Sequence, residues 1–182
     1  MNSKKLLVFS DSHGSVTALK AVFNWAKDYI PPNGTICMTA CLGDGLSDLG
    51  KAADETGFYS EWKLVCGNND FNIHAPEAAV FDFCEHRFYM CHGHRQALYY
   101  GFSKLLTISK HNEAEVALFG HSHVPYCKKE NGILLVNPGS VGQPRSAIGA
   151  TFAVIECTED EPVKAEFFGI KAKGSIKKIK LT

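Results

Sequence analysis

The sequence predicts a single α+β domain in which two stacked β-sheets are flanked by helices. Up to residue 70, strand-like apolar runs alternate with helical patterns, which is the βαβαβ order of a mostly parallel sheet. From residue 78 onwards strand-like runs dominate, and two neighbouring runs have the pattern of an antiparallel pair. The 182 residues contain no repeat, low-complexity stretch or linker, so we expect one domain over residues 1–182.

The first elements follow from the spacing of apolar residues. An apolar run within residues 1–10 predicts a strand. Residues at helical spacing then predict a helix, and they are Val16, Leu19, Phe23 and Ala26. The segment Pro31-Pro32-Asn33-Gly34 predicts a turn after this helix. The order repeats with a strand in TICMTACLGD, a helix in the polar segment through Ala53, and a strand in EWKLVCGNND.

The second half predicts more strands than helices. The runs AVFDFC and RFYMCHG, divided by Glu85-His86, predict an antiparallel pair. A helix is then marked by Leu98, Phe102 and Leu105, and the strand-like run VALFGH follows it. Further strands are expected at residues 124–128, 132–136, 151–157 and 163–168. In the last of these, apolar and charged residues alternate, which predicts one face exposed to water.

Composition indicates a globular protein, because 45% of the residues are hydrophobic and 21% are charged. The apolar run after Lys4 and Lys5 is too short for a signal-peptide core, and we expect no membrane span. Seven cysteines lack a C-x-x-C pair and mostly lie in apolar runs, which favours buried reduced thiols in a cytoplasmic protein over a disulfide framework. Because the net charge is +0, the protein as a whole does not attract nucleic acid or anionic membranes electrostatically.

Five apolar runs end in side chains that bind metals. The motifs are Asp11-Ser12-His13, Gly43-Asp44, Gly67-Asn68, His92-Gly93-His94 and Gly120-His121-Ser122-His123. Each has an ordinary structural interpretation when taken alone: a helix cap for Asp11, turns for Asp44 and Asn68, and core residues for the histidines. Together they favour a cluster of carboxylate and imidazole that suits two divalent cations, with Asp44 between its glycines placed to bridge them.

Other motifs leave alternatives open. A structural zinc site is disfavoured, because no cysteine has ligand spacing, and Cys66 and Cys91 are out of phase with the ligands and should point into the core. Asn137-Pro138-Gly139-Ser140 could cradle a phosphate or form a turn after a strand, with equal weight. The five lysines between Lys171 and Lys180 favour a solvated terminal strand over a nucleic-acid contact.

In this order, the five metal-binding motifs resemble those of the calcineurin-like metallophosphoesterase superfamily. With Asn137 to Ser140, Gln143-Pro144-Arg145 and the short length, the chain is most similar to the compact YfcE-like phosphodiesterase branch. The resemblance implies a four-layer α/β/β/α sandwich of two mixed sheets. It also implies the ligands of two metal ions, with Asp44 as the bridge. One ion would be held by Asp11, His13, Asp44 and His123, and the other by Asp44, Asn68, His92 and His121.

The chain departs from larger relatives at one position. They carry a histidine that contacts the phosphate and protonates the leaving group, whereas this chain has Asn69. An amide has no proton to give near neutral pH, so the general acid is left unnamed, with Asp70 and His94 as candidates. We therefore expect a preference for leaving groups that depart without protonation, such as aryl phosphates.

The resemblance implies a metal-dependent phosphodiesterase, in which a hydroxide bridging two cations attacks a small phosphodiester or phosphomonoester. The expected catalytic residues are Asp44, Asn68, His92 and His94. Imidazole-rich ligands favour Mn²⁺, Fe, Zn²⁺, Co²⁺ or Ni²⁺ over Mg²⁺, and the resemblance selects Mn²⁺.

Two other functions are alternatives to this hydrolase. The same family includes a retromer subunit that works through protein contacts, but it lacks some metal-binding side chains, whereas every ligand position is filled here. A nuclease would need a cationic groove with stacking aromatics, and the zero net charge disfavours a nucleic-acid partner. The expected partner is a small phosphoester substrate, and the sequence is compatible with a homo-oligomer.

Overall fold

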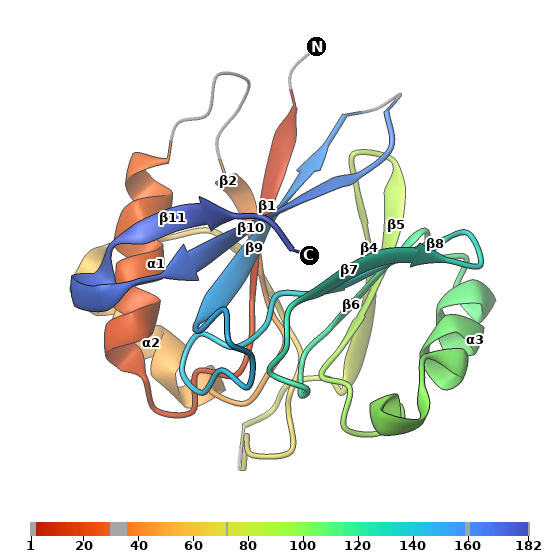
Figure 1. Ribbon diagram of the computed structural model, residues 1–182, viewed down its shortest axis with the longest axis horizontal. Helices are drawn as coiled ribbons and strands as arrows, with labels where there is room; N and C mark the ends of the chain where they lie inside the picture. Colours follow the sequence, from red (N-terminus) through yellow and green to blue (C-terminus); the bar gives the residue numbers. More distant parts are fainter. Residues whose placement is uncertain (1–2, 30–35, 72, 159–160, 182) are drawn as a thin grey trace.

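The computed structural model describes residues 3–29, 36–71, 73–158 and 161–181 (Figure 1). The helices are α1 (Val16–Asp28), α2 (Leu46–Thr56) and α3 (Ser103–His111), with short 3₁₀ turns η1 (Leu98–Tyr100) and η2 (Ala172–Gly174). The strands are β1 (Lys4–Phe9), β2 (Ile36–Cys41), β3 (Glu61–Leu64), β4 (Ala78–Phe83), β5 (His86–Cys91), β6 (Val116–Phe119), β7 (Tyr126–Glu130), β8 (Ile133–Asn137), β9 (Thr151–Cys157), β10 (Lys164–Ile170) and β11 (Ile176–Ile179).

The first sheet has six strands in the order β11-β10-β9-β1-β2-β3. Strands β1, β2 and β3 run parallel because α1 and α2 are the crossover connections between them, as the βαβαβ order predicts. The other half of the sheet is antiparallel, so the sheet is mixed. Apolar residues of α1, among them Leu19, Phe23 and Ala26, pack against one face of this sheet.

The second sheet has five strands in the order β4-β5-β6-β8-β7 and is also mixed. Strands β4 and β5 form the predicted antiparallel pair, while β5, β6 and β8 run parallel. Helix α3 covers its outer face, where Leu105 packs in a buried cluster with Phe119 and Leu135.

The two sheets stack face to face, which confirms the predicted four-layer α/β/β/α sandwich (Figure 1). Strand β1 shows the arrangement in one run of sequence. Leu6 and Val8 point into the cluster between the sheets, whereas Leu7 and Phe9 point beneath the helices. A strand that is covered on both faces needs a continuous apolar run, and β1 has one.

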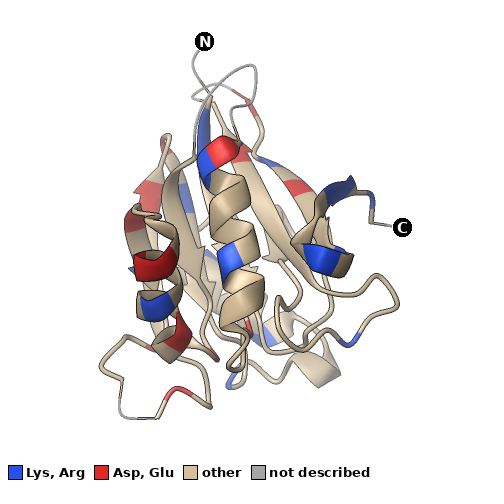
Figure 2. Ribbon diagram, turned by 90° about the vertical axis from the view of Figure 1, so that its left-hand side faces the viewer, with Lys and Arg blue, Asp and Glu red and all other residues tan. Residues whose placement is uncertain are grey.

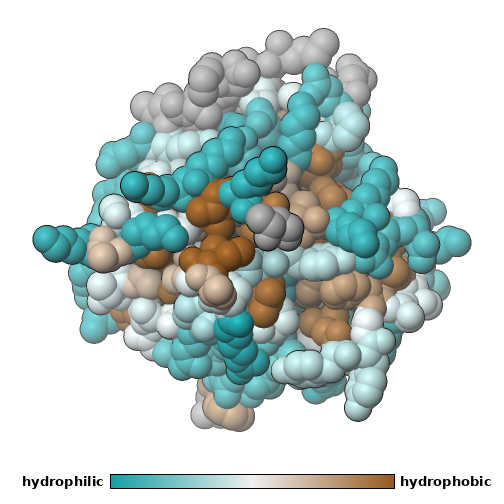
Figure 3. All heavy atoms as spheres, in the orientation of Figure 1, coloured by the Kyte–Doolittle hydropathy of each residue, from teal (hydrophilic) through white to brown (hydrophobic). Residues whose placement is uncertain are grey.

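Hydrophobic atoms reach the surface where the edges of the two sheets meet. Figure 3 shows them between the β10–β11 side and the β7 side, bordered by hydrophilic residues. Cys127, Phe167 and Leu181 line this shallow groove together with lysines from β10 and β11.

The helix predicted around Leu98, Phe102 and Leu105 is divided into two pieces. Gly101 has a φ of 106°, which a helix does not accommodate, so η1 ends before it and α3 begins after it. The turn predicted at Pro31 to Gly34 lies outside the described residues.

Two strand boundaries also differ from the prediction. The turn expected at Glu85-His86 falls instead at Cys84 and Glu85, whose φ values are 50° and 65°, and His86 already belongs to β5. Pro125 has no N–H for a strand ladder, so the strand expected at residues 124–128 begins at Tyr126.

The C-terminal strands are solvated only in part. Lys164 is exposed on the predicted wet face of β10, but Phe168 on the same face is buried beneath the α1 side of the sheet. Strand β11 forms the solvated terminal strand that the lysines predict, and Lys178 pairs with Glu166 at 2.5 Å.

The cysteines are less uniformly buried than predicted. All seven are free, and Cys91 is buried beneath α3 as expected. Cys66, however, is only half-buried against the cluster under α1 and α2. Cys37 and Cys127 are exposed.

Charges of both signs are interspersed over α1 and α2, which lie side by side (Figure 2). Lys20 of α1 and Glu55 of α2 form an exposed ion pair at 2.5 Å. Among the helices that the structure describes, none is long and apolar enough to cross a membrane.

Candidate metal centre

The predicted ligands lie on loops at the carboxyl ends of strands from both sheets. The loops after β1, β2, β3, β5 and β6 carry Asp11, His13, Asp44, Asn68, His92, His121 and His123. These loops meet at one end of the sandwich, at the bottom of Figure 1. Side chains that are more than a hundred residues apart in sequence therefore come into contact, for example His13 and His123.

One group of potential ligands consists of Asp11, His13 and His123. The Nε2 atoms of His13 and His123 lie 3.3 Å apart. Asp11 Oδ1 lies 3.1 Å from the Nε2 atom of His123 and 3.7 Å from that of His13. Three donor atoms that face one point at these separations can close around one cation.

A second group consists of Asp11, Asp44 and His92. The Nε2 atom of His92 lies 3.4 Å from Asp44 Oδ2 and 3.9 Å from Asp11 Oδ1. Asp44 Oδ2 also lies 3.6 Å from His13 Nε2 in the first group. Both carboxylates therefore connect the two groups, with Asp11 shared by them and Asp44 in contact with both.

Backbone carbonyl groups fix the tautomers of two imidazoles. His92 Nδ1 lies 2.7 Å from the carbonyl oxygen of Leu42, and His123 Nδ1 lies 2.5 Å from that of Gln143. Because a carbonyl can only accept, each Nδ1 must carry the proton. Each Nε2 then faces the cluster, and in the neutral imidazole its lone pair has the orientation of a metal ligand.

The residues of the cluster fit a bound cation. Asp11 Oδ1 and His92 Nε2 are buried and have no hydrogen-bond partner among the described residues. Burial disfavours ionisation of Asp44, but contacts with His92 and Asn69 outweigh it and lower the pKa of Asp44 to about 2. Burial likewise opposes ionisation of Asp11, yet contacts with His123 and His13 hold its pKa well below the usual range. Two anionic carboxylates and imidazoles whose Nε2 atoms face them suit a divalent ion of the transition series.

The backbone at the predicted ligands is strained. Five of them have a positive φ, namely Asp11 (58°), His13 (44°), Asp44 (55°), His121 (65°) and His123 (59°). Residues with a side chain rarely adopt this left-handed region, and such conformations gather at functional sites. Packing in the surrounding loops therefore holds these side chains where the chain alone would not place them.

The glycine that precedes a ligand allows two loops to approach each other closely. A Cβ atom at Gly43 would lie 2.4 Å from the backbone nitrogen of Gly67, and a Cβ atom at Gly67 would lie 2.1 Å from Asp44 Oδ1. Neither position has room for a side chain, so the Gly43-Asp44 and Gly67-Asn68 motifs have a steric cause.

Three predicted residues lie around the two groups rather than in them. The ring centroid of His121 lies 5.1 Å from the ring centroid of His92. The backbone N–H of His121 donates to Asp11 Oδ2 at 3.1 Å. The ring of His94 lies 5.4 Å from that of His92. Asn68 is exposed on the loop after β3.

Asn69, which the sequence placed at the position of the missing acid, contacts Asp44 directly. Its side-chain amide donates to Asp44 Oδ2 at 2.6 Å, and its backbone N–H donates to Asp44 Oδ1 at 2.7 Å. Asn69 thus positions the carboxylate that connects the two groups, a role that the sequence did not reveal.

Asp70 has a structural position. Its carboxylate accepts four backbone N–H groups, from Asp44, Gly45, Leu46 and Gly67, at 2.7–2.9 Å. These four hydrogen bonds hold the Asp70 carboxylate among backbone donors, where it fixes the loop rather than facing a leaving group.

The segment Asn137 to Ser140 braces the ligand loops rather than presenting groups to a phosphate. Ser140 Oγ donates to the carbonyl oxygen of Asp11 at 2.7 Å, and Asn137 Nδ2 donates to that of Gly120 at 2.9 Å. Both side chains are completely buried. Of the two interpretations that the sequence left open, the turn is therefore the one found.

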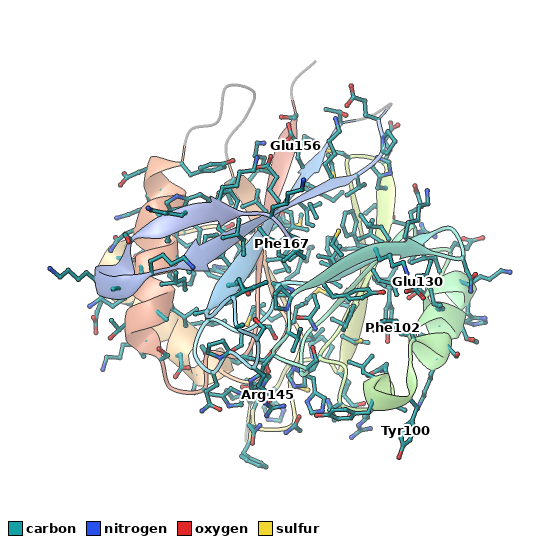
Figure 4. The ribbon with its side chains drawn as sticks, in the orientation of Figure 1. Tyr100, Phe102, Glu130, Arg145, Glu156 and Phe167 are labelled. Atoms are coloured by element: carbon teal, nitrogen blue, oxygen red, sulfur yellow. The ribbon has the colours of Figure 1, made fainter. Side chains whose placement is uncertain are left out.

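Arg145 lies at the same end of the molecule as the centre (Figure 4). Its backbone N–H donates to the carbonyl oxygen of His123 at 3.1 Å, and its side chain is exposed.

Two stacked mixed sheets with carboxylates and imidazoles gathered at one shared end define a class of proteins, the α/β/β/α metallophosphoesterases. Residues 5–160 match the model of the calcineurin-like phosphoesterase superfamily domain. The chain belongs to this superfamily, which confirms the family that the motifs predict.

The chain is similar to named proteins over most of its length. It is 31% identical to the "Probable metallophosphoesterase" of Mycoplasma genitalium over 147 residues, which cover 78% of this chain and 80% of the relative. A crystal structure of a predicted phosphoesterase from Streptococcus pneumoniae superposes with a TM-score of 0.75 at 28% identity and covers 98% of both chains.

Vps29 of Entamoeba histolytica, solved as a complex with Zn²⁺, superposes with a TM-score of 0.72 at 18% identity. The likeness covers 96% of this chain and 97% of that chain, and it shows a common fold.

Proposed function

We propose that the protein is a metal-dependent phosphodiesterase that hydrolyses small phosphodiesters and also accepts phosphomonoesters. The observation that carries this proposal is the pair of buried atoms Asp11 Oδ1 and His92 Nε2, which lie 3.9 Å apart. Among the described residues neither has a hydrogen-bond partner, although Asp11 Oδ1 has an ion-pair contact with His123 Nε2 at 3.1 Å. Burying such atoms is costly unless they are paired, and a cation would pair both. The free cysteines fit a cytoplasmic protein.

The proposed ligand sets hold two divalent ions, with Mn²⁺ as the first candidate and Fe, Zn²⁺, Co²⁺ and Ni²⁺ as alternatives. Such ions, when bound, supply Lewis acidity and lower the pKa of a coordinated water. The first set is Asp11, His13, Asp44 and His123, and the second is Asp44, Asn68, His92 and His121. Asp11 is in contact with members of both sets, so it holds the two sets together.

Residues beside the cluster would act on the substrate. Asn68 is exposed next to Asp44's loop, where its amide can orient a phosphoryl oxygen. Asn69 is committed to Asp44 and has no proton to transfer. Because Asp70 is occupied by backbone donors, His94 is the candidate that is left to move a proton to the leaving group.

Steady-state hydrolysis assays test this function. Bis-p-nitrophenyl phosphate, p-nitrophenyl phosphate and cyclic nucleotides are offered to protein treated with EDTA and then given one metal at a time. We expect no turnover after EDTA and recovery that is strongest with Mn²⁺. Nitrophenyl diesters should be cleaved much faster than alkyl diesters, because Asn69 stands in place of a general acid. Equal rates would contradict this replacement.

A non-catalytic scaffold is the second candidate, because the fold is shared with Vps29 at a TM-score of 0.72. That neighbour was itself solved with Zn²⁺, so metal binding alone does not separate the two functions. Turnover separates them. A protein that binds metal but hydrolyses none of these esters with any metal would support the scaffold.

A further inference from the structure

Exposed apolar side chains gather on the loops that carry the candidate ligands. They are Phe71, Tyr99, Tyr100 and Val124, with exposed fractions between 41% and 93%. Tyr99 has the most direct relation to the centre. Its ring centroid lies 6.3 Å from that of His121, and the two ring planes are 76° apart.

Tyr99 is presented by a packed turn. Its neighbour Leu98 packs against the cluster beneath α3. A Cβ atom at Gly93 would lie 2.7 Å from Leu98 Cδ1, so the turn rests directly on the His92-Gly93-His94 loop. Backbone N–H groups of Tyr100 and Gly101 donate within the turn at 2.9 and 3.2 Å. The backbone that carries Tyr99 is therefore held against the loop that also carries His92.

Packing of the core does not explain why the side chain of Tyr99 is exposed. Tyr99 is 78% exposed although the turn that carries it is held in place, so its ring remains in water beside the candidate ligands. Tyr100, one residue further, is 93% exposed and projects away from the body of the molecule (Figure 4). One turn thus carries two tyrosines, of which only Tyr99 contacts a candidate ligand.

We propose that Tyr99 forms the wall of a subsite for an aromatic ring in the substrate, either a nucleobase or an aryl group. A phosphoester bound at the cluster carries its organic group past His121, where the face of Tyr99 can stack on a ring. Stacking on an exposed aromatic side chain is favourable for any planar ring. The subsite rests on the proposed phosphodiesterase function, because it selects among esters that the metal centre binds.

Two substrates that release the same leaving group test the subsite, because any difference between them then comes from the group that is retained. Bis-p-nitrophenyl phosphate and methyl p-nitrophenyl phosphate both release p-nitrophenolate, but only the first retains a ring. We expect Tyr99→Ala to lower kcat/KM for the first substrate by about tenfold and to leave the second nearly unchanged. Tyr99→Phe should keep the wild-type ratio. Tyr100→Ala is the matched control and should also keep it.

The p-nitrophenyl ester of thymidine 5′-phosphate distinguishes the two sources of the ring. A tenfold loss with this ester alone assigns the subsite to a nucleobase, and a loss with both ring-bearing esters assigns it to aromatic rings in general. An unchanged ratio of kcat/KM in an active Tyr99→Ala variant overturns the subsite.

Binding without turnover provides a second measurement. Phenylphosphonate and methylphosphonate are titrated calorimetrically into the Mn²⁺-loaded protein, and we expect the phenyl compound to bind more tightly in wild type but not in Tyr99→Ala. If no ester is hydrolysed while this preference persists, the proposed function fails and the ring subsite stands. If hydrolysis occurs but wild type shows no preference for the phenyl compound, the subsite fails and the function stands.

Discussion

Among single residues, Asp11 contacts members of both groups of ligands. Its Oδ1 is shared by both groups of ligands, and its Oδ2 accepts the backbone N–H of His121. Its carbonyl oxygen accepts the hydroxyl of Ser140. One residue thus joins the ligands of the first sheet to those of the second, and its positive φ is held by these contacts.

We predict that Asp11→Asn lowers the affinity for Mn²⁺ by well over tenfold, because the amide removes a negative charge from both groups of ligands at once. Isothermal titration calorimetry of metal-free protein measures this change. Asp54→Asn is the matched control, since Asp54 is exposed on α2, away from the centre, and should bind as wild type. Wild-type affinity in Asp11→Asn would show that Asp11 is not a ligand.

Ser140 acts through Asp11. Its buried hydroxyl donates to the carbonyl oxygen of Asp11 and accepts the N–H of Gln143, both at 2.7 Å. Ser140→Ala leaves the N–H of Gln143 without this partner and leaves the carbonyl oxygen of Asp11 with only the N–H of Gly142, at 3.2 Å, so we predict a loss of about 1–3 kcal/mol in the free energy of unfolding, measured by urea denaturation. The exposed Ser47→Ala on α2 is the control. A Ser140→Ala variant as stable as this control would contradict the bracing role.

Among the elements, the junction of β2, α2 and the loop after β3 depends on one side chain. Helix α2 has no side-chain cap at Gly45, and the carboxylate of Asp70 accepts the N–H groups at its start instead. The same carboxylate accepts the N–H groups of Asp44 and Gly67. A negative charge at the N-terminus of a helix is favourable, so Asp70 stabilises α2 while it positions Asp44.

We predict that Asp70→Asn costs about 2 kcal/mol of stability, because the new amide NH₂ must face N–H donors in place of one carboxylate oxygen. Denaturation in urea measures the cost, again against Asp54→Asn. The affinity for Mn²⁺ should fall as well, since Asp44 loses a support of its backbone. If turnover of p-nitrophenyl esters were lost while stability and metal affinity stayed at wild-type values, Asp70 would be the general acid after all.

Sequence alone predicted the elements better than their connections. Strands such as β1 and β9 were recognised because burial on both faces leaves an apolar run. Helix α3 was placed too early because the conformation of Gly101 is not visible in apolar spacing. The candidate ligands can be located from the sequence because they follow strand ends, whereas the Ser140 to Asp11 hydrogen bond joins residues 129 positions apart and depends on the tertiary fold.

In the whole molecule, the candidate centre lies across the join between the two sheets. Asp11, His13 and Asp44 follow strands of the first sheet, whereas His92 and His123 follow strands of the second. Each group of ligands draws on both sheets. Bound metal would therefore connect at this end two layers that are otherwise held together by the apolar cluster between them.

We predict that Mn²⁺ stabilises the whole sandwich. At a concentration a hundred times its Kd, a ligand that binds only the folded state adds about 2.7 kcal/mol, which raises Tm by about 5–11 °C for a protein of this size. Differential scanning fluorimetry measures the shift, which EDTA should reverse and Asp11→Asn should abolish. Hydrogen exchange locates it: protection should increase in the loops after β1 and β2 and also in those after β5 and β6. Protection confined to the loops of one sheet would show that the metal does not join the two layers, even if Tm rose.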